Sequence, residues 1–420
     1  MFITNENLYK QTDSYDYMIS KEELKKIVKF QREQLLKQDT TIKREKVDQI
    51  DINLPFALII SGIRRSGKST LMKQLIRNIK KFYYINFEDP KVINFEVSDF
   101  SKLDEVFIEE YGENGNYFFD EIQNVKKWEL FIRRIVDEKK HVVITGSNAS
   151  LLSRELGTRL TGRHLKYELF PFSFKEFLKL KNKKPDKNTF KEYLFKGGFP
   201  EYLKIEKSEI LEELFKDIII RDIITRHKIK SIKIIEEMAL YLMTNVGKEF
   251  SYNSLKKIFN LGSINSVISF ISYFEDSYLL FTVSKFDFSF KKRLINQKKV
   301  YSIDNGLSSI NSTSFSEDSG RMLENMVFLN LRKKNKDIFY FKENKECDFV
   351  IREGINIVKA IQVCYEFNAD NQDREIGGLL ESLKKFKLKE GLILTYDQEE
   401  EFKIENKKII VKPVWKWLLE

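Results

Sequence analysis

The sequence lacks the apolar runs and the cysteine content that mark membrane and secreted proteins. None of the apolar runs in its 420 residues approaches the roughly 18 residues that a membrane helix needs, and the longest, near residues 54–60, is interrupted by Pro55. The N-terminus does not show the basic and then apolar order of a signal peptide. Two cysteines, Cys347 and Cys364, cannot form a disulfide framework. We therefore expect a cytoplasmic protein with no membrane partner.

The sequence also lacks tandem repeats and low-complexity linkers, so composition marks its domain boundaries only coarsely. A chain of this length is too long for one compact core, and roughly two to four domains are expected. The net charge of +10 permits nucleic-acid binding. Because lysine is spread through the chain rather than massed in one block, the charge equally fits the lysine- and isoleucine-rich composition of an AT-rich genome.

Strand-like apolar runs alternate with helix-spaced apolar residues in the first part of the chain. A helix is expected at residues 21–37, and Trp128, Phe131, Ile132 and Ile135 recur at helical spacing after residue 127. The expected strands lie at residues 57–60, 82–87, 117–119, 141–145 and 165–170. Strands that alternate with helices predict a mostly parallel sheet.

Pro171 ends this alternation, and three further stretches follow. Residues 173–229 are helical and rich in Lys, Phe and Leu. The next stretch has helices at 232–245, 253–259 and 264–274 and apolar strands at 278–283 and 286–294, which is the order of a winged helix. The last stretch has a helix at 320–333, strands at 338–341, 347–351 and 357–365, a helix at 373–386 and a strand at 391–396.

A glycine-rich loop follows the first strand and precedes a helix. Its pattern, G-x-x-x-x-G-K-S, is typical of a phosphate-binding loop, and glycine permits the backbone geometry that this loop needs. We expect Lys68 to neutralise the β- and γ-phosphate oxygens of ATP and the Ser69 hydroxyl to ligate Mg²⁺. Arg64 and Arg65 make the loop unusually basic and contact phosphate, a neighbouring subunit or solvent. The residues expected to bind the nucleotide are Gly62, Ile63, Arg64, Arg65, Ser66, Gly67, Lys68, Ser69 and Thr70.

Two carboxylates end the third expected strand. Mg²⁺ needs a carboxylate near the phosphates, and Asp120 fits that role together with Ser69. Glu121 is placed to orient and deprotonate the water that attacks the γ-phosphate, and Gln123 to help position that water. An Asp-Glu pair after an apolar run is otherwise more often a turn at the end of a strand, but the preceding phosphate loop favours the catalytic interpretation.

Short polar side chains follow the fourth expected strand in the segment Thr145-Gly146-Ser147-Asn148. The carboxyl end of a parallel strand faces the ligand crevice, so these side chains can sense the γ-phosphate. Ser and Asn also cap helices well. We leave both roles open for Ser147 and favour γ-phosphate sensing, and hence a catalytic role, for Asn148.

Together these segments resemble a family of prokaryotic AAA-type ATPases whose members join an AAA domain to a C-terminal domain of unknown function. The resemblance covers nearly the whole chain and implies an AAA fold that binds ATP and Mg²⁺, but it does not identify a physiological role. It rests on residues 61–70, 83–89, 118–123 with Trp128, 145–148, 160–163, 171–177, 197–200 and 301–304.

The resemblance also implies a homo-oligomer. AAA ATPases commonly supply an arginine to the γ-phosphate of a neighbouring subunit from the region after the sensor segment, where a guanidinium offsets charge that develops in phosphoryl transfer. Arg163 is our first candidate for this catalytic role, because it ends the matching Leu160–Arg163 segment, and Arg159 is the second. The alternative is a surface salt bridge.

We thus expect an α/β protein: a P-loop AAA domain with a parallel sheet, a helical lid, a winged-helix domain and a C-terminal restriction-endonuclease-like α/β domain. The expected boundaries are 1–45 for an N-terminal helical segment, 46–172 for the AAA ATPase domain, 173–229 for the lid, 230–299 for the winged helix and 300–420 for the endonuclease-like domain.

The C-terminal half argues against the usual DNA-binding and DNA-cleaving modes. The expected recognition helix, residues 264–274, has no Lys or Arg and only one amide, Asn265, so an interaction role is favoured and any DNA contact would use the wing at residues 291–293. Glu324 and Asp348 match two acidic positions of restriction-type nucleases. The following Glu-x-Lys is replaced by Gln362-Val-Cys364, which predicts an inactive site with a buried thiol.

The sequence therefore favours an Mg²⁺-dependent ATP hydrolase that couples hydrolysis to remodelling of a bound macromolecule. One alternative is a nucleotide-dependent switch or scaffold that binds DNA or protein with negligible turnover, and a second is an ATP-dependent nuclease. Intact Lys68, Asp120 and Glu121 favour the first function. A protein or nucleic-acid partner would bind through the C-terminal domains.

Overall fold

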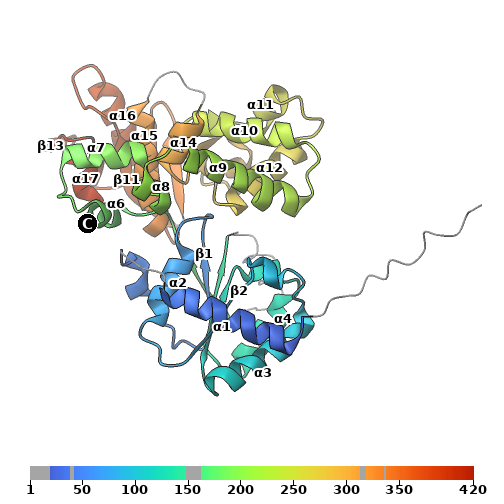
Figure 1. Cartoon of the computed structure of the whole chain (residues 1–420). Helices are drawn as coiled ribbons and strands as arrows, with labels where there is room; N and C mark the ends of the chain where they lie inside the picture. Colours follow the sequence, from blue (N-terminus) through green and yellow to red (C-terminus); the bar gives the residue numbers. More distant parts are fainter. Residues whose placement is uncertain (1–18, 38–41, 148–161, 313–317, 335–336) are drawn as a thin grey trace, which may run out of the picture.

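The first lobe of the protein is a five-stranded parallel sheet covered by helices on both faces (Figure 1). A computed structural model describes residues 19–37, 42–147, 162–312, 318–334 and 337–420. The sheet has the order β2-β3-β4-β1-β5, and its parallel character confirms the prediction. The strands are β1 (Ala57–Ser61), β2 (Phe82–Asn86), β3 (Asn116–Asp120), β4 (Val142–Gly146) and β5 (His164–Glu168).

Alternate residues of these strands enter two separate hydrophobic cores. Ala57 and Ile59 of β1 face one core, which also contains apolar residues of α1 (Lys21–Lys37), α3 (Phe100–Tyr111) and α4 (Trp128–Asp137). Leu58 and Ile60 face the other, with α2 (Lys68–Ile76) and the short helix η1 (Glu45–Gln49). Because both faces are covered, every residue of β1 is buried, and the strand reads as a continuous apolar run.

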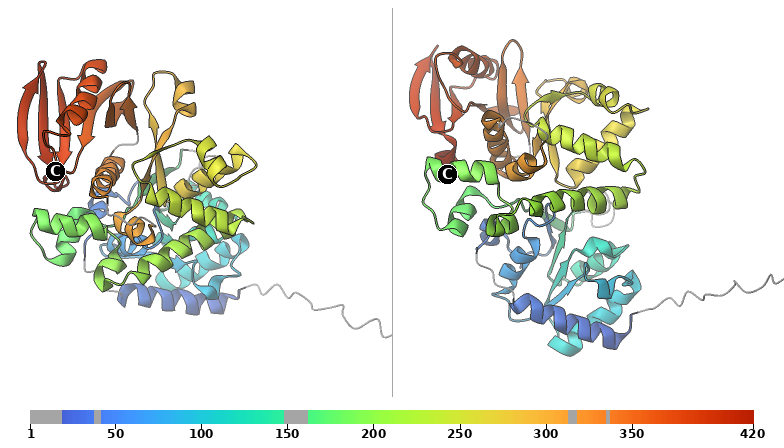
Figure 2. Two further views of the ribbon diagram at one scale, coloured as in Figure 1. Left: turned by 90° about the horizontal axis from the view of Figure 1, so that it is seen from above. Right: turned by 45° about the horizontal axis from the view of Figure 1, so that its top comes forward.

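The second lobe consists of helices from α6 onward and a mixed nine-stranded sheet, and it lies over the first lobe in two views (Figures 1 and 2). Its helices before β7 are α6 (Phe174–Lys181), α7 (Lys187–Lys196), α8 (Pro200–Ile205), α9 (Glu209–Asp217), the π-helical segment η6 (Ile218–Thr225), α10 (Ile232–Thr244), α11 (Tyr252–Ile258) and α12 (Ile264–Asp276).

The nine strands run in the order β13-β14-β12-β11-β10-β9-β7-β8-β6. They are β6 (Glu249–Phe250), β7 (Leu280–Lys285), β8 (Lys298–Ser302), β9 (Ile338–Lys342), β10 (Glu346–Glu353), β11 (Asn356–Val363), β12 (Glu390–Thr395), β13 (Glu400–Ile404) and β14 (Lys407–Pro413). The remaining helices are α13 (Phe290–Ile295), α14 (Asn305–Asn311), α15 (Ser319–Lys334), α16 (Gln372–Lys385) and α17 (Val414–Trp417).

The β7–β8 hairpin belongs to the same sheet as the C-terminal strands. Ser284 and Lys285 of β7 pair in parallel with Phe339 and Tyr340 of β9, and β8 pairs antiparallel with β7 on its other side. The domain boundary expected between residues 299 and 300 falls within β8. One continuous sheet therefore joins the region after α12 to the rest of the C-terminal half.

The strand predicted at residues 286–294 is wrong. The partner of β7 is β8, and the intervening residues form α13. The Asp287 side chain accepts the Ser289 N–H at 2.8 Å, and the Ser289 side chain accepts the Lys292 N–H at 3.4 Å. These local side-chain bonds cap a short helix and compete with strand pairing.

Arg44 connects the two lobes near the carboxyl ends of β1 and β5. Its side chain is 3% exposed; it donates to the carbonyl oxygens of Ser66 and Phe170 and pairs with Glu176 at 2.8 Å. Glu176 also caps the start of α6 through the Ser173 N–H. The phosphate-loop segment is thereby fixed against the first helix of the second lobe.

Among the described helices, none is long and apolar enough to cross a membrane. Both cysteines are buried and free. Burial raises the pKa of the Cys347 thiol and of the Cys364 thiol to about 12, so both stay protonated at neutral pH.

Candidate functional site

The glycine-rich loop joins the carboxyl end of β1 to the amino end of α2, as the sequence predicts. A side chain at position 62 could not fit, because its Cβ would lie 2.1 Å from the carbonyl oxygen of Leu169. Gly67 has a φ of +93°, in the region that favours glycine, immediately before the first turn of α2. The loop N–H groups and the amino end of α2 can therefore face a phosphate chain.

Lys68 reaches back across the loop and is almost fully buried. Its Nζ lies 3.2 Å from the carbonyl oxygen of Gly62, 3.3 Å from that of Ile63 and 3.2 Å from Oε1 of Glu121. The ammonium is thus held among oxygen atoms at the place where the loop pattern puts the phosphates. The Lys68–Glu121 pair links the loop to the end of β3.

Asp120 and Ser69 come together, as the magnesium prediction requires. The Asp120 side chain is 1% exposed; it accepts hydrogen bonds from the hydroxyls of Ser69 and Thr145 and from the Tyr84 hydroxyl at 3.3 Å. Burial and the neighbouring Glu121 raise its pKa despite these donors. A carboxylate next to a serine hydroxyl is an oxygen-donor set that suits Mg²⁺, and the charge of a bound ion would favour the ionised form of Asp120.

Glu121 adopts a left-handed backbone conformation, with φ of 49° and ψ of 46°, that turns the chain sharply after β3. Its N–H donates to the Thr145 hydroxyl at 2.9 Å, and its carboxylate also accepts a hydrogen bond from Gln123. Although burial opposes ionisation, Lys68 and Gln123 together lower the Glu121 pKa. Glu121 is therefore an ionised carboxylate, and the buried Gln123 Oε1 has no hydrogen-bond partner among the described residues.

Arg64 and Arg65 contact the second lobe rather than solvent alone. Arg64 Nε lies 3.2 Å from Asp222 of η6, and its Nη1 lies 2.7 Å from Glu88. Arg65 pairs with Glu201 of α8 at 3.2 Å. Burial disfavours the Arg64 cation, but Asp222 and Glu88 outweigh this effect and raise its pKa.

Asp222 and Arg226 are site residues that the sequence pattern does not identify. Asp222 is 3% exposed, and the Ser147 hydroxyl donates to it at 3.5 Å. Burial lowers the Arg226 pKa while the charges of Asp222 and Glu121 raise it, and its buried Nη1 has no hydrogen-bond partner among the described residues. In the structure, the π-helical segment draws attention to this region, because such segments are frequent at functional sites. Sequence periodicity does not reveal a π-helical segment.

A cavity of about 570 Å³ lies between the loop and the second lobe. It is large enough for a nucleotide-sized ligand. Both lobes line it: the first lobe contributes Arg64, Arg65, Gly67, Lys68, Ser69, Thr70, Glu88 and Glu121, and the second contributes Pro200, Glu201, Lys204, Asp217 and Arg221.

Comparisons with known proteins agree with this geometry. A profile described as "AAA domain" matches residues 55–178, and profiles of two domains of unknown function, DUF8612 and DUF4143, match residues 187–316 and 319–417. An uncharacterized protein of Methanocaldococcus jannaschii is 39% identical over 416 residues, covering 90% of this chain and 92% of that protein. An uncharacterized protein of Haemophilus influenzae is 29% identical, covering 87% of this chain and 94% of that protein.

The chain belongs to this family of prokaryotic AAA-domain proteins. Its AAA domain carries the nucleotide-binding loop described above. Among solved structures, AMPPCP-bound DnaA from Aquifex aeolicus is 14% identical, covers 60% of this chain and 88% of that chain, and has a TM-score of 0.28.

Of the remaining predicted site residues of this AAA protein, Asn148 and the second-choice arginine, Arg159, fall outside the described residues. Arg163 precedes β5, and its carbonyl oxygen accepts the N–H of Ala57, the first residue of β1, whereas the phosphate loop follows Ser61, the last. Arg163 is therefore at the opposite edge of the sheet from its own loop, and its Nη1 lies 2.6 Å from Asp137.

The Lys68–Glu121 pair yields a prediction that separates ligand binding from stability. We expect Lys68→Ala to lose most ATP affinity and to destabilise the nucleotide-free protein by roughly 3–5 kcal/mol, because Glu121 would be left buried without its cation. The double variant Lys68→Ala/Glu121→Gln should regain much of that stability but none of the affinity. Nucleotide titration and urea unfolding measure the two effects, and unchanged ATP affinity in Lys68→Ala would contradict the assignment of the loop.

Proposed function

We propose that this AAA protein is an Mg²⁺-dependent ATP hydrolase that couples hydrolysis to the remodelling of a bound macromolecule. The observation that carries the proposal is the convergence of Lys68, Ser69, Asp120 and Glu121 at one edge of the sheet, beside a cavity lined by both lobes. These groups supply a phosphate-binding cation, two oxygen ligands for a metal and an ionised carboxylate.

The contacts of Lys68 support a defined order of events in the site. The phosphates of an entering nucleotide compete with Glu121 for the Lys68 ammonium, because both are anions that need the same cation. Once Lys68 turns to phosphate, the Glu121 carboxylate is free to accept a proton from water, while the hydrogen bond from Gln123 keeps that carboxylate in place. Mg²⁺, held by Ser69 and Asp120, would offset charge on the β- and γ-phosphates.

Contacts between the loop and the second lobe support the coupling of hydrolysis to movement. Arg64 of the loop binds Asp222 in the π-helical segment, and the Ser61 hydroxyl at the end of β1 lies 2.7 Å from the Tyr278 hydroxyl, which follows α12. A phosphate chain that attracts Arg64 away from Asp222 thus changes the charge balance of η6 directly. The alternative of a switch or scaffold with negligible turnover uses the same contacts without chemistry.

Two substitutions at the end of β3 test hydrolysis. Asp120→Asn should weaken Mg²⁺-dependent nucleotide binding, because it removes an anionic metal ligand. Glu121→Gln should retain ATP and lose turnover, because it removes the proton acceptor and leaves the metal site intact. Steady-state phosphate release and nucleotide titration distinguish the two. Hydrolysis by Glu121→Gln at the parent rate would exclude Glu121 as the catalytic carboxylate, and a parent chain without phosphate release would favour the switch.

We also propose that Arg163 acts on the nucleotide of a neighbouring subunit in a homo-oligomer. The position of Arg163 at the far edge of the sheet supports action in trans, because it is on the side opposite its own phosphate loop. Its partner Asp137 is an exposed carboxylate, so the ion pair contributes little free energy. Arg163 can therefore leave Asp137 and bind a phosphate at small cost.

A mixing experiment tests action in trans. Arg163→Ala and Glu121→Gln should each be inactive alone, whereas their mixture should recover part of the ATPase activity, because a mixed interface can join an intact Glu121 to an intact Arg163. Asp137→Ala serves as the control that breaks the ion pair and keeps the arginine. A monomer with full ATPase activity would rule the proposal out.

The order α10-β6-α11-α12-β7 supports the winged-helix assignment expected for residues 230–299, and α15 with β9–β12 supports the restriction-endonuclease-like assignment expected for residues 300–420, with the lid at residues 173–229. Because β8 crosses residues 299 and 300 and pairs with β7, the two regions share one sheet. Helix α12 buries Val267, Phe270, Ile271 and Phe274, in keeping with a packing role for its apolar face. The partner would therefore meet the wing rather than this face.

A specific observation favours nucleic acid as the partner of the wing. Phe288 and Phe290 are 74% and 65% exposed, and Lys291 and Lys292 beside them are exposed as well. Exposed aromatic rings next to cations suit stacked bases and phosphates of a single strand. The Lys292 ammonium lies 3.8 Å from the Asp287 carboxylate, which is a long contact for an ion pair.

The wing is tested with single-stranded DNA and fluorescence anisotropy at several salt concentrations. Lys291→Ala/Lys292→Ala should reduce the slope of log affinity against log salt by about 1.4, which is the expected change for two lost phosphate contacts. Phe288→Ala/Phe290→Ala should weaken binding and leave the slope unchanged. Lys256→Ala/Lys257→Ala on α11 is the matched control. Equal binding by all variants would remove the wing from the proposal.

A further inference from the structure

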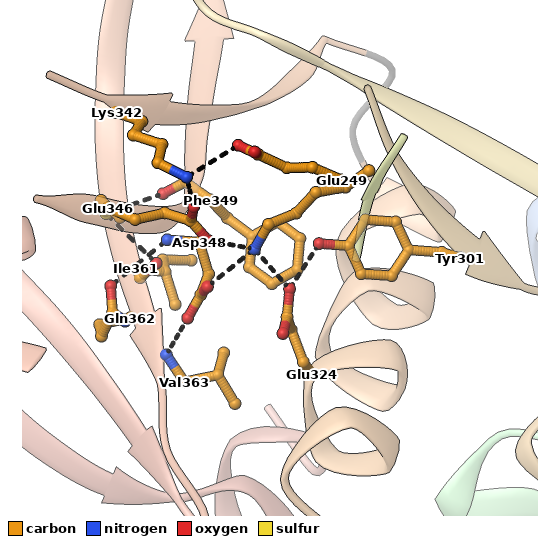
Figure 3. Close-up of polar contacts among 12 residues, drawn as sticks. Glu249, Tyr301, Glu324, Lys342, Glu346, Asp348, Phe349, Ile361, Gln362 and Val363 are labelled. Atoms are coloured by element: carbon orange, nitrogen blue, oxygen red, sulfur yellow. Dashed lines mark hydrogen bonds and ion pairs between the residues drawn. The ribbon is translucent and has the colours of Figure 1, made fainter. Parts of the chain in front are cut away.

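A buried lysine lies within the carboxylate cluster of the C-terminal sheet, far in sequence from the nucleotide site. Lys299 of β8 is 2% exposed, and its Nζ lies 3.0 Å from Glu324 Oε1, 2.8 Å from Glu346 Oε1 and 3.1 Å from Asp348 Oδ1. Glu324 comes from α15, and Glu346 and Asp348 come from β10. Figure 3 shows these carboxylates converging from the helix and the sheet.

The carboxylates are also bonded on their outer sides. Glu324 Oε1 accepts the Tyr301 hydroxyl at 2.6 Å, and Asp348 Oδ2 accepts the Val363 N–H at 2.9 Å (Figure 3). Glu346 pairs with Lys342, which in turn pairs with Glu249 at 3.1 Å. These bonds hold the three acids around one central point, and that point is occupied by the ammonium of Lys299.

The charge of the cluster requires a cation at its centre. Burial opposes the charge of Lys299, but its surrounding acids raise its pKa well above the usual value. Burial raises the pKa of Glu324 to about 7, even with Lys299 beside it. An apolar side chain in place of Lys299 would leave several anions facing one another in a buried space.

The residues do not fit the divalent metal that a nuclease site would hold. Among the described residues, no group of three or more His, Cys, Asp or Glu side chains forms a metal site. Gln362, at the third ligand position, donates to Glu375 at 2.6 Å and accepts the Asp348 N–H at 3.3 Å, so its side chain is turned away from the cluster. A metal would also have to displace the ammonium, which sits at hydrogen-bond distances rather than at the shorter distances of Mg²⁺ ligands.

We propose that Lys299 is the resident cation of this cluster: its tethered ammonium takes the place of a divalent metal ion, closes the site to Mg²⁺ and Mn²⁺, and ties β8 to α15 and β10. The cluster shares no residue with the nucleotide site, so this inference does not depend on the proposed ATP hydrolysis.

Mn²⁺ titration of the full-length, nucleotide-free chain, with free Mn²⁺ followed by electron paramagnetic resonance, tests the proposal. The parent chain should bind no Mn²⁺ at this cluster. Lys299→Ser should gain about one Mn²⁺ per chain, because three carboxylates then face an open position. Its melting temperature should rise with Mn²⁺, whereas that of the parent should not. Lys299→Ser/Asp348→Asn should lose the gained ion, and Lys342→Ser, which removes a lysine at the rim of the cluster, should gain none.

Three outcomes would overturn the proposal. The first is Mn²⁺ binding by the parent chain that Asp348→Asn abolishes. The second is a folded Lys299→Ser variant that gains no Mn²⁺. The third needs no variant and decides the question if Lys299→Ser does not fold: Fe²⁺ with ascorbate cuts a backbone near bound iron, so cleavage of the parent chain near residues 324 and 346–348 would show a metal in the cluster. Absence of that cleavage supports Lys299 as the cation.

Discussion

Arg44 donates to the carbonyl oxygens of Ser66 and Phe170 and pairs with Glu176, and this buried contact fixes the phosphate loop relative to both lobes. Burial opposes the charge of Glu176, yet Arg44 lowers its pKa, so the carboxylate stays ionised. A buried pair of this kind is costly to separate, because either charge would remain without a partner. The backbone of the loop is thus held from behind while its front remains free for a ligand.

The phosphate loop packs against the second lobe as well as the first. Ile63, in the middle of the loop, is fully buried in the hydrophobic core that contains the helices from α6 onward and much of the second sheet. Ser61 contacts Tyr278, and the neighbouring β5 contacts α15 through the Glu168–Arg332 ion pair at 2.8 Å. The loop thus contacts η6 directly through Arg64, and the ends of the strands beside it contact Tyr278, after α12, and Arg332 of α15.

The local features of the fold were readable from the sequence, and the long-range ones were not. The parallel sheet and the Lys68–Ser69 and Asp120–Glu121 positions follow from period, spacing and chain direction, which are properties of short segments. The helix α13 was missed because a serine and an aspartate form local caps that an apolar pattern does not show. Asp222 and Lys299 were missed because their partners lie far away in the chain: Arg64 is 158 positions from Asp222, and Asp348 is 49 positions from Lys299.

Lys68 and Lys299 are both buried, and they show how similar ion pairs lead to different chemistry. Lys68 faces one carboxylate and two carbonyl oxygens beside a cavity. A phosphate chain can therefore take the place of Glu121 as the partner of Lys68, because it carries more negative charge and the lysine stays paired. Lys299 faces three carboxylates that are bonded on their outer sides, so an incoming metal would have to expel a cation that the protein cannot release. A phosphate chain is an anion that can pair with the Lys68 ammonium. A metal ion would be a second cation among carboxylates that Lys299 already neutralises. The number of acids around each ammonium thus decides which buried lysine can exchange its partner for a ligand.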